Sequence, residues 1–273
     1  MKLSIITINL NNASGLRKTI ESVVSQKFSD FEYLIIDGGS TDGSVEVIKE
    51  YNDKITFWVS ETDEGIYSAM NKGILKATGV YCLFLNSGDW LVDNILESVF
   101  TINFNEDIFY GNIILEFKDK PQIVDCACGK FNLTFYDFYM GTIRHQAAFI
   151  KRNLFDKFGL YDESNCIVSD WQFFVKTIIF GNATYKYQNI TISHFDANGI
   201  GTKPSIKHNK ERQKILRSFL PDKVLQDYKK YDELIQHNFT ISKELQRYKH
   251  RFENIDKFIS KLKKTFYSII IHI

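Results

Sequence analysis

Residues 33–44 read YLIIDGGSTDGS, an apolar run that ends on an aspartate and continues into a glycine-rich segment. The run Tyr33–Asp37 has the length and apolar character of a buried β-strand. Glycines directly after a strand indicate a tight turn. A carboxylate at this end of a strand in an α/β sheet lies where such sheets bind their ligands. The stretch therefore predicts an α/β fold with Asp37 at a ligand site.

The neighbouring segments repeat a strand followed by a helix. Apolar runs predict strands at 3–9, 33–37, 55–61 and 80–85. Helical spacing predicts helices at 16–24 behind a Ser14 cap, at 44–51, and at 64–79 with Gly79 as the C-terminal glycine. Further along the chain, 107–117 reads as a strand, and 151–159 and 169–181 read as helices. Repeated strand–helix units imply a mostly parallel sheet flanked by helices, with the strands' carboxyl ends along one edge.

Length, composition and charge suggest one large domain and an appendage. A chain of 273 residues that is 44% hydrophobic can bury a full core. From Lys203 onward there are 17 Lys and Arg against 8 Asp and Glu, a net charge of +9, whereas residues 1–202 carry −8. We therefore expect an α/β domain at 1–204 and a basic helical extension at 205–273, in different surroundings.

The cysteines and the N-terminus point to the cytoplasm. Four cysteines (Cys82, Cys126, Cys128 and Cys166) form no CxxC pair, which favours free thiols in a reducing compartment and disfavours zinc. The N-terminal run MKLSIITINL lacks a cleavage site and reads as a first strand. No run reaches the roughly 18 apolar residues that span a bilayer.

The segment after the second predicted strand does not suit a dinucleotide. DGGSTDG lacks GxGxxG spacing, and Asp37 and Asp42 would repel a pyrophosphate. A carboxylate here suits the N–H of a nucleobase or the hydroxyls of a sugar. The alternative is that both aspartates cap a turn and the following helix.

A second polar cluster, NSGD at 86–89, follows the strand at 80–85. Asp89 offers hard oxygen ligands to Mg²⁺ or Mn²⁺, which usually bridge substrate phosphates. The alternative is an ordinary turn.

Five ordered blocks resemble a family-2 glycosyltransferase of the GT-A fold, of the bacterial type that builds exopolysaccharide and O-antigen chains. They cover about residues 1–200 and read TINLNN, DGGSTDGS, SETDEGIYSAMNKGILKATGVYCLFLNSGD, HQAAF and GLYDESNCIVSDWQFF. The resemblance implies inverting transfer from a nucleotide-diphosphate sugar, with Mn²⁺ or Mg²⁺ holding the diphosphate. The implied acceptor is a saccharide or a lipid-linked saccharide, and no nucleic acid is implied.

The resemblance also assigns roles to individual residues. Residues implied to bind the nucleotide sugar are Thr7, Asn9, Asp37, Asp63, Asn71, Lys72 and Ser87, with Asp37 on the nucleobase. Asp89 would hold the metal, and Asp170 would be the general base. The chain departs from the family pattern at Asn86, where an aspartate is usual, so His194 is a candidate second metal ligand. Ser169 also replaces the glutamate that usually precedes the catalytic aspartate.

Several candidates carry two interpretations. His145 contacts the acceptor or the donor phosphate, or is a hydrogen-bonded structural histidine. Trp171 stacks on the acceptor sugar, or is a core residue. Lys72 and Arg144 approach phosphates, or face solvent. The segment 198–201 closes over the donor as a lid, or is a surface loop.

The C-terminal segment predicts a basic amphipathic helix. Its apolar residues at helical spacing are Phe252, Ile255, Phe258, Ile259, Leu262 and Phe266, interspersed with lysines. Such a helix binds an anionic membrane surface, which would place the protein at the inner face of the cell membrane with a lipid-linked acceptor. The alternative is packing on the catalytic domain or on a second subunit, as in a homodimer.

Two other functions fit parts of the sequence. A sugar-phosphate nucleotidyltransferase also uses an α/β sheet and a metal, although TINLNNASGLRK is poor in the glycines and basic residues of its phosphate loop. A non-catalytic carbohydrate-binding relative fits the altered metal motif.

Overall fold

The computed structural model describes residues 1–126, 129, 132–197 and 206–270, apart from the side chains of 254, 258 and 261–270. The predicted lid at 198–201, Cys128 and the predicted apolar positions Phe258, Leu262 and Phe266 therefore lie outside the described set. Contacts divide the chain into two compact units, Met1–Ile215 and Leu216–Ile273. This division lies within helix α8 (Ile206–Phe219), later in the chain than the predicted boundary at 204.

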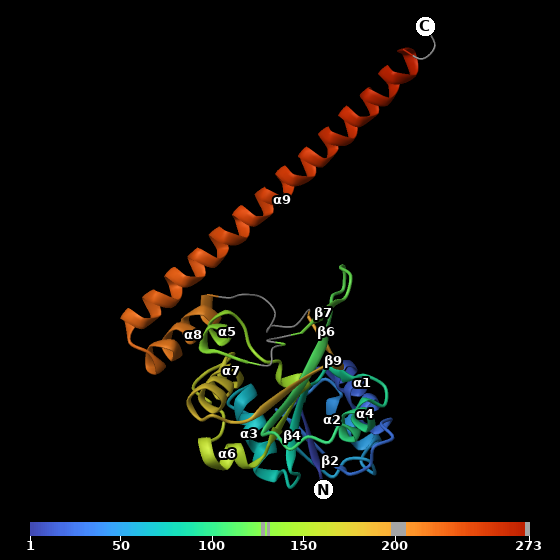
Figure 1. Ribbon diagram of the computed structural model, residues 1–273. Coiled ribbons are helices and arrows are strands. Elements are labelled where there is room, and N and C mark those ends of the chain that lie inside the picture. The colour runs from blue at the N-terminus through green and yellow to red at the C-terminus, as the bar shows by residue number, and fades with distance from the viewer. Residues whose placement is uncertain (127–128, 130–131, 198–205, 271–273) are drawn as a thin grey trace. The chain divides into compact units, whose positions relative to one another are not determined.

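The first unit is built on one mixed sheet with the strand order β3-β2-β1-β4-β8-β6-β9-β5, and β7 pairs with β6 (Figure 1). The strands are β1 (Leu3–Asn9), β2 (Phe31–Asp37), β3 (Phe57–Ser60), β4 (Tyr81–Asn86), β5 (Trp90–Leu91), β6 (Ile108–Glu116), β7 (Ile123–Asp125), β8 (Ala148–Lys151) and β9 (Tyr185–Asp196). The pairings make β1 to β4, β6 and β9 run in one direction and β5, β7 and β8 in the other. The predicted α/β fold with a mostly parallel sheet is confirmed, and six carboxyl ends meet at one edge.

Helices cover both faces of this sheet. They are α1 (Ala13–Val24), α2 (Ser44–Glu50), α3 (Ile66–Lys76), α4 (Ile95–Thr101), α5 (Phe135–Met140), α6 (Asn153–Phe158) and α7 (Ser169–Phe174), with the 3-10 helix η1 (His145–Ala147) and the π-helix η2 (Val175–Phe180) that continues α7. In Figure 1, α1, α2 and α4 lie on one side of the sheet, and α3, α6 and α7 on the other. Leu16, Ile20 and Val23 of α1 belong to the same buried cluster as Leu3 and Ile5 of β1.

Two predicted helix caps are wrong. The N-cap of α1 is Asn12, not Ser14, and its side chain accepts a hydrogen bond from the Gly15 N–H. Helix α3 ends at Lys76, and Ala77 is already extended, so Gly79 is not the C-terminal glycine. Gly79 is needed for a different reason, because a Cβ there would lie 2.6 Å from the backbone nitrogen of Ser4. It allows the chain entering β4 to approach β1.

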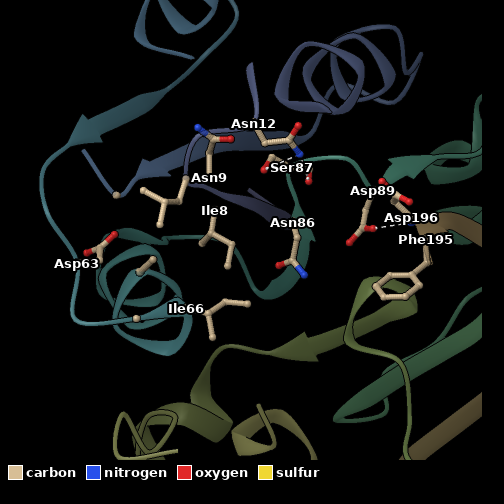
Figure 2. Close-up of a pocket in the computed structure, with 14 residues that line it drawn as sticks. Ile8, Asn9, Asn12, Asp63, Ile66, Asn86, Ser87, Asp89, Phe195 and Asp196 are labelled. Atoms are coloured by element: carbon tan, nitrogen blue, oxygen red, sulfur yellow. Dashed lines mark hydrogen bonds between the residues drawn. The ribbon is translucent and has the colours of Figure 1, made fainter. Parts of the chain in front are cut away.

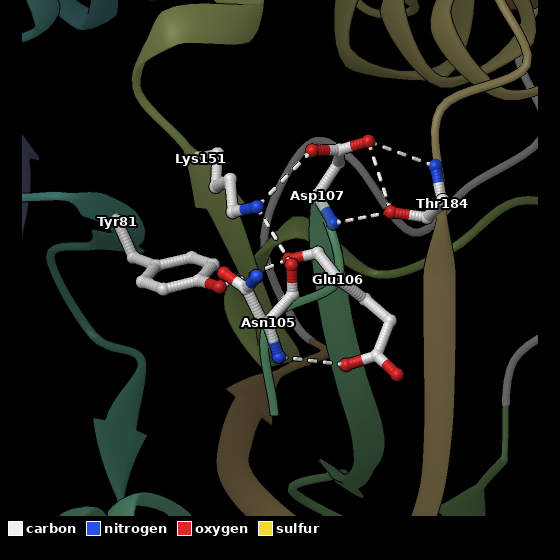
Figure 3. Close-up of polar contacts among 6 residues, drawn as sticks. All are labelled: Tyr81, Asn105, Glu106, Asp107, Lys151 and Thr184. Carbon is white, nitrogen blue, oxygen red and sulfur yellow. Dashed lines mark hydrogen bonds and ion pairs between the residues drawn. The ribbon is translucent and has the colours of Figure 1, made fainter. Parts of the chain in front are cut away.

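A polar network ties four strands together at the edge opposite their carboxyl ends (Figure 3). The Asp107 carboxylate accepts hydrogen bonds from the Thr184 N–H and hydroxyl, both at 2.9 Å, and pairs with Lys151 at 3.3 Å. Lys151 also donates to the Asn105 carbonyl at 2.6 Å, and the Tyr81 hydroxyl donates to the Glu106 carbonyl at 2.9 Å. The network joins the first residue of β4 and the residues just before β6 and β9 to the last residue of β8, so it holds their register.

Glu32 forms a second network at this edge. Its Oε1 accepts hydrogen bonds from the Ser4 hydroxyl, from the Thr78 N–H and hydroxyl, and from the Gly79 N–H, at 2.5–3.1 Å. Burial by itself raises the pKa of Glu32, but the hydrogen bonds outweigh it and lower the pKa. The carboxylate therefore links β1 and β2 to the start of β4.

The second unit is helical, as predicted, and contains helix α9 (Asp222–Ile270) (Figure 1). Among the described residues, no helix combines the length and the apolar character that a bilayer span requires. The described cysteines Cys82, Cys126 and Cys166 form no disulfide.

Candidate active site

A cavity of about 440 Å³ opens at the carboxyl edge of the sheet (Figure 2). Its walls come from the ends of β1, β4 and β9, from the turn after β2 and from the start of α3. The lining residues are Ile8, Asn9, Leu10, Asn12, Gly38, Asp63, Gly65, Ile66, Ala69, Asn86, Ser87, Asp89, Phe195 and Asp196. Four predicted site residues are among them: Asn9, Asp63, Ser87 and Asp89.

Asp37 does not line this cavity, although the sequence assigned it to the nucleobase. Its carboxylate is fully buried and accepts hydrogen bonds from Asn9 Nδ2 at 2.7 Å, from Ser40 N at 2.9 Å, and from the Ser40 and Ser60 hydroxyls at 2.6 Å each. Burial alone raises the pKa of Asp37, but these bonds lower it overall. Asp37 therefore holds Asn9 and the 37–40 turn in place, and Asn9 is the residue that faces the ligand space.

Asp42 follows the capping alternative. Its carboxylate accepts hydrogen bonds from Ala13 N at 2.8 Å and from Ser44 N and Oγ. It therefore joins the first residues of α1 and α2.

Thr7 is not among the residues that line the cavity, although Asn9, two residues later on the same face of β1, is. The Thr7 hydroxyl is fully buried and hydrogen-bonds the Tyr33 hydroxyl at 3.0 Å.

The three predicted binding residues around the start of α3 have different roles. They are Asp63, Asn71 and Lys72. Asp63 lines the cavity, where its Oδ1 pairs with Lys72 Nζ. Lys72 also pairs with Glu61 at 2.7 Å, so its charge serves two carboxylates. Asn71 is 4% exposed and bonds to the backbone of Tyr161 through both ends of its amide, which makes it a link between α3 and residue 161.

Three buried oxygens in this cavity have no hydrogen-bond partner among the described residues. They are Asn9 Oδ1, Asp63 Oδ2 and Asn86 Oδ1. A buried acceptor without a partner costs about 1–3 kcal/mol, so each is suited to accept an N–H or O–H from a ligand. Nearby, Asn12 Nδ2 donates to the Ser87 carbonyl at 2.9 Å and fixes the loop after β4.

Asp89 is 3% exposed and lies deep in the cavity wall (Figure 2). Its Oδ1 accepts a hydrogen bond from Asp196 N at 3.1 Å, and its Oδ2 accepts one from Gln146 Nε2 at 3.3 Å. Burial raises its pKa to about 7. A nearby cation would stabilise the ionised form, and the adjacent Asp196 brings a second carboxylate to this end of the cavity.

His194 is not among the cavity residues, so the structure does not bring it to the cavity with Asp89. Its Nδ1 lies 2.7 Å from Glu116 Oε1, and its ring stacks on Trp90 with centroids 4.6 Å apart. Among the described residues, no group of three His, Cys, Asp or Glu side chains gathers as a metal cluster. Asp196, two residues further along β9, lines the cavity together with Asp89.

A second cavity of about 390 Å³ adjoins the first. The two share Gly65, Ile66, Asn86 and Phe195 as wall residues. The two cavities therefore lie next to each other and have part of their wall in common.

Asp170 lines the second cavity. Its Oδ1 accepts a hydrogen bond from the Tyr67 hydroxyl at 2.8 Å, and its Oδ2 lies 2.9 Å from His145 Nδ1. Burial alone raises the pKa of Asp170, but the His145 and Tyr67 interactions lower it below its ordinary value. Asp170 is therefore ionised at neutral pH and held from two sides, and the buried His145 Nε2 has no partner among the described atoms.

Trp171 and Arg144 line the second cavity as well, but both are engaged within the protein. Trp171 is 2% exposed, its Nε1 donates to the Phe138 carbonyl at 2.8 Å, and Arg212 lies 4.5 Å above its ring. These contacts favour the core interpretation of Trp171. Arg144 pairs with Asp125 at 2.8 Å.

The sequence analysis missed Asn12, Tyr67, Gln146, Phe195 and Asp196. Asn12 and Asp196 flank predicted residues, but only the pairing of Trp90 in β5 with His194 in β9 brings Asp196 to Asp89. No local sequence pattern predicts such a pairing between distant residues. Tyr67 is a buried residue of α3, and its hydroxyl donates to Asp170.

Curated relatives match this chain over 72–73% of its length. A PGL/p-HBAD biosynthesis glycosyltransferase of Mycobacterium bovis is 29% identical over 203 residues, which cover 72% of this chain and 77% of the relative. An uncharacterised glycosyltransferase of Mycobacterium tuberculosis is 30% identical over 213 residues, which cover 73% of this chain and 77% of that protein.

Solved structures share the fold. S. aureus TarS 1-349 in complex with UDP-GlcNAc has a TM-score of 0.62 at 18% identity, over 75% of this chain and 61% of that one. The mannosyltransferase PcManGT of Pyrobaculum calidifontis, in complex with GDP-Man and Mn²⁺, has a TM-score of 0.56 at 13% identity, over 74% of this chain and 58% of that one. In the longer TarS structure the match spans 37% of the chain.

The sequence pattern of glycosyl transferase family 2 matches residues 4–159, which include the first four strands, Asp63, Asp89 and His145. This match covers more than half of the 273 residues. The chain belongs to glycosyl transferase family 2.

Proposed function

We propose that this protein is an inverting, metal-dependent glycosyltransferase that moves a sugar from a nucleotide-diphosphate sugar to a saccharide or lipid-linked acceptor in surface polysaccharide synthesis. The observation that carries the proposal is the pair of adjoining cavities, with Asp89 in the wall of one and Asp170 in the wall of the other. The structural neighbours that hold UDP-GlcNAc or GDP-Man support a nucleotide sugar as the donor.

The first cavity suits the donor. Asn9 Oδ1 and Asp63 Oδ2 are buried acceptors that match the N–H of a nucleobase and the hydroxyls of a ribose. Asn86 lines both cavities, so it is placed at the boundary between donor and acceptor.

The residues around Asp89 fit a hard divalent cation. Mg²⁺ is typically held by one or two carboxylates together with substrate phosphates, and Asp89 and Asp196 supply such a pair. Burial raises the pKa of Asp89 to about 7, and a bound cation would favour its ionised form. A bound Mn²⁺ or Mg²⁺ would neutralise charge on the departing diphosphate.

The second cavity suits the acceptor and the base. An acceptor hydroxyl there forms a bond to the anomeric carbon as the bond from that carbon to the diphosphate breaks, and Asp170 takes the hydroxyl proton. Tyr67 and His145 each bond one Asp170 oxygen, and the remaining lone pairs can accept the acceptor hydroxyl. Attack on the face opposite the leaving group inverts the anomeric centre.

Release of nucleoside diphosphate from a panel of nucleotide sugars, with Mn²⁺ and candidate acceptors, tests the proposal. Asp170→Asn should lower kcat about 10²- to 10⁴-fold because a positioned base is lost. The control Asp156→Asn makes the same chemical change at a 70% exposed side chain in α6 and should leave kcat unaltered. Full activity in Asp170→Asn, or retention of the donor's anomeric configuration in the product by NMR, would contradict the mechanism.

A lipid-linked acceptor would place the reaction in the cytoplasm at the inner face of the cell membrane. Transfer of labelled sugar to the organic-extractable fraction of membranes tests this setting. Transfer only to water-soluble saccharides would speak against it.

A further inference from the structure

Helix α9, the long helix in Figure 1, carries exposed apolar side chains that repeat every seven residues. One set at this spacing is Leu234, Ile241, Tyr248 and Ile255. The other set is Asn238, Leu245, Phe252 and Ile259. The two sets alternate at intervals of four and three residues without interruption, and their apolar members are 41–66% exposed.

This spacing identifies the kind of surface that the stripe fits. A straight α-helix has 3.6 residues per turn, so a strict seven-residue repeat drifts by about 20° per heptad unless the helix supercoils around another helix. A helix that lies on a membrane needs a broader apolar face. The two sets occupy the a and d positions of a coiled coil, with Asn238 at an a position.

The residues beside the stripe are complementary to a second copy of the same helix. The g positions hold Glu244 and Arg251, and the e positions five residues later hold Lys249 and Asp256. In a parallel, in-register pair, a g residue lies opposite the e residue of the next heptad on the other strand. Glu244 then meets the partner's Lys249, and Arg251 meets the partner's Asp256.

We propose that α9 forms a parallel, two-stranded coiled coil with α9 of a second copy of this chain, so that the protein is a homodimer. Asn238 faces the partner's Asn238 inside the seam, and a single polar residue at an a position fixes register and strand number. The flanking positions carry both signs, Glu244 and Asp256 against Lys249 and Arg251, which suits a second copy better than an anionic membrane, to which basic residues bind.

Light scattering coupled to gel filtration of the full chain tests the assembly. The expected mass is twice the 31.8 kDa of one chain. Leu245→Glu with Phe252→Glu puts two charges into the seam and should yield a monomer. The matched control, Gln246→Glu with His250→Glu, puts the same residues on the outer face and should leave the dimer intact. Three results would overturn the proposal. They are a wild-type protein that stays monomeric at the highest concentration measured, a control variant that dissociates as readily as the seam variant, and a wild-type tetramer.

Charge reversal tests the orientation. Glu244→Lys should raise the dimer dissociation constant about tenfold, since it opposes two lysines at each of two symmetric contacts. Adding Lys249→Glu should restore wild-type association in a parallel pair. Failure of the second change to rescue the first would overturn the parallel register. Wild-type protein that is monomeric and co-sediments with phosphatidylglycerol vesicles would show that a membrane, not a second copy, covers the stripe.

Discussion

Replacing Asp89 by Asn should make the folded protein more stable at alkaline pH while it abolishes sugar transfer. Burial raises the pKa of Asp89 from its ordinary value of 3.8 to about 7. Between these values the folded protein keeps a proton that the unfolded chain has released, so stability falls as pH rises through this range. Above pH 7 the folded protein carries a buried charge that the Asn variant lacks.

The size of the effect follows from the two pKa values. One pKa unit corresponds to 1.36 kcal/mol, so the buried charge costs about 4 kcal/mol at pH 8. Asn can still accept the hydrogen bond from Asp196 N, but its amide group would meet the Gln146 amide, which loses about 1 kcal/mol. The expected gain in unfolding free energy is therefore about 3 kcal/mol at pH 8 and about 1 kcal/mol at pH 5.

Urea unfolding followed by tryptophan fluorescence, without metal or nucleotide, measures this difference. All three tryptophans, Trp58, Trp90 and Trp171, lie in the unit Met1–Ile215, so the signal reports on the unit that contains Asp89. Asp156→Asn serves as the exposed control and should show no pH-dependent gain. A gain for Asp89→Asn that stays constant from pH 5 to pH 8 would refute the assignment of a buried, uncompensated charge.

Three further changes test the scaffold and the donor cavity. Glu32→Gln weakens an acceptor of four hydrogen bonds and should lower the free energy of unfolding by about 2 kcal/mol at pH 7. Because the pKa of Glu32 is lowered in the folded protein, this loss of stability should shrink as pH falls below 4.5. Urea titrations measure it, and a loss that does not change with pH would contradict the reasoning. Gly79→Ala brings a methyl group to 2.6 Å from Ser4 N and should cost about 2 kcal/mol, whereas the exposed Val80→Ala should cost far less. Asp63→Ala should weaken binding of the nucleoside diphosphate about 10- to 100-fold by calorimetry, and unaltered affinity would remove Asp63 from the donor site.

The strand–helix order of residues 1–91 was predictable because each element carries its own period. The four parallel strands and the clustering of Asn9, Ser87 and Asp89 at one edge followed from that order. The sequence did not show which residues at the end of a strand line the cavity. Asn9 lines it, whereas Thr7, on the same face of β1, does not. Asp37 illustrates the same limit, since its four hydrogen bonds come from three residues, Asn9, Ser40 and Ser60, in separate parts of the chain.

The second half of the sheet was less predictable for a topological reason. Strand β9 inserts between β6 and β5, which lie about 75 and 100 residues earlier in the chain. Asp196 lies beside Asp89 only because of this pairing. The sequence alone therefore suggested His194, and not Asp196, as a candidate second metal ligand. The heptad repeat of α9, in contrast, is entirely local and is present in the sequence from Leu234 to Ile259.

One edge of the sheet holds the strands together and the other lines the cavity, and this separation affects how a new sugar specificity could arise. Glu32 and Asp107 anchor the strands at one edge, and the exposed Leu10 and Ile66 line the ligand space at the other. Because the anchoring bonds do not depend on the ligand-facing side chains, exchanging the latter should disturb folding little. Directed evolution towards another sugar can therefore sample this rim broadly, while selection for expression keeps the opposite edge unaltered.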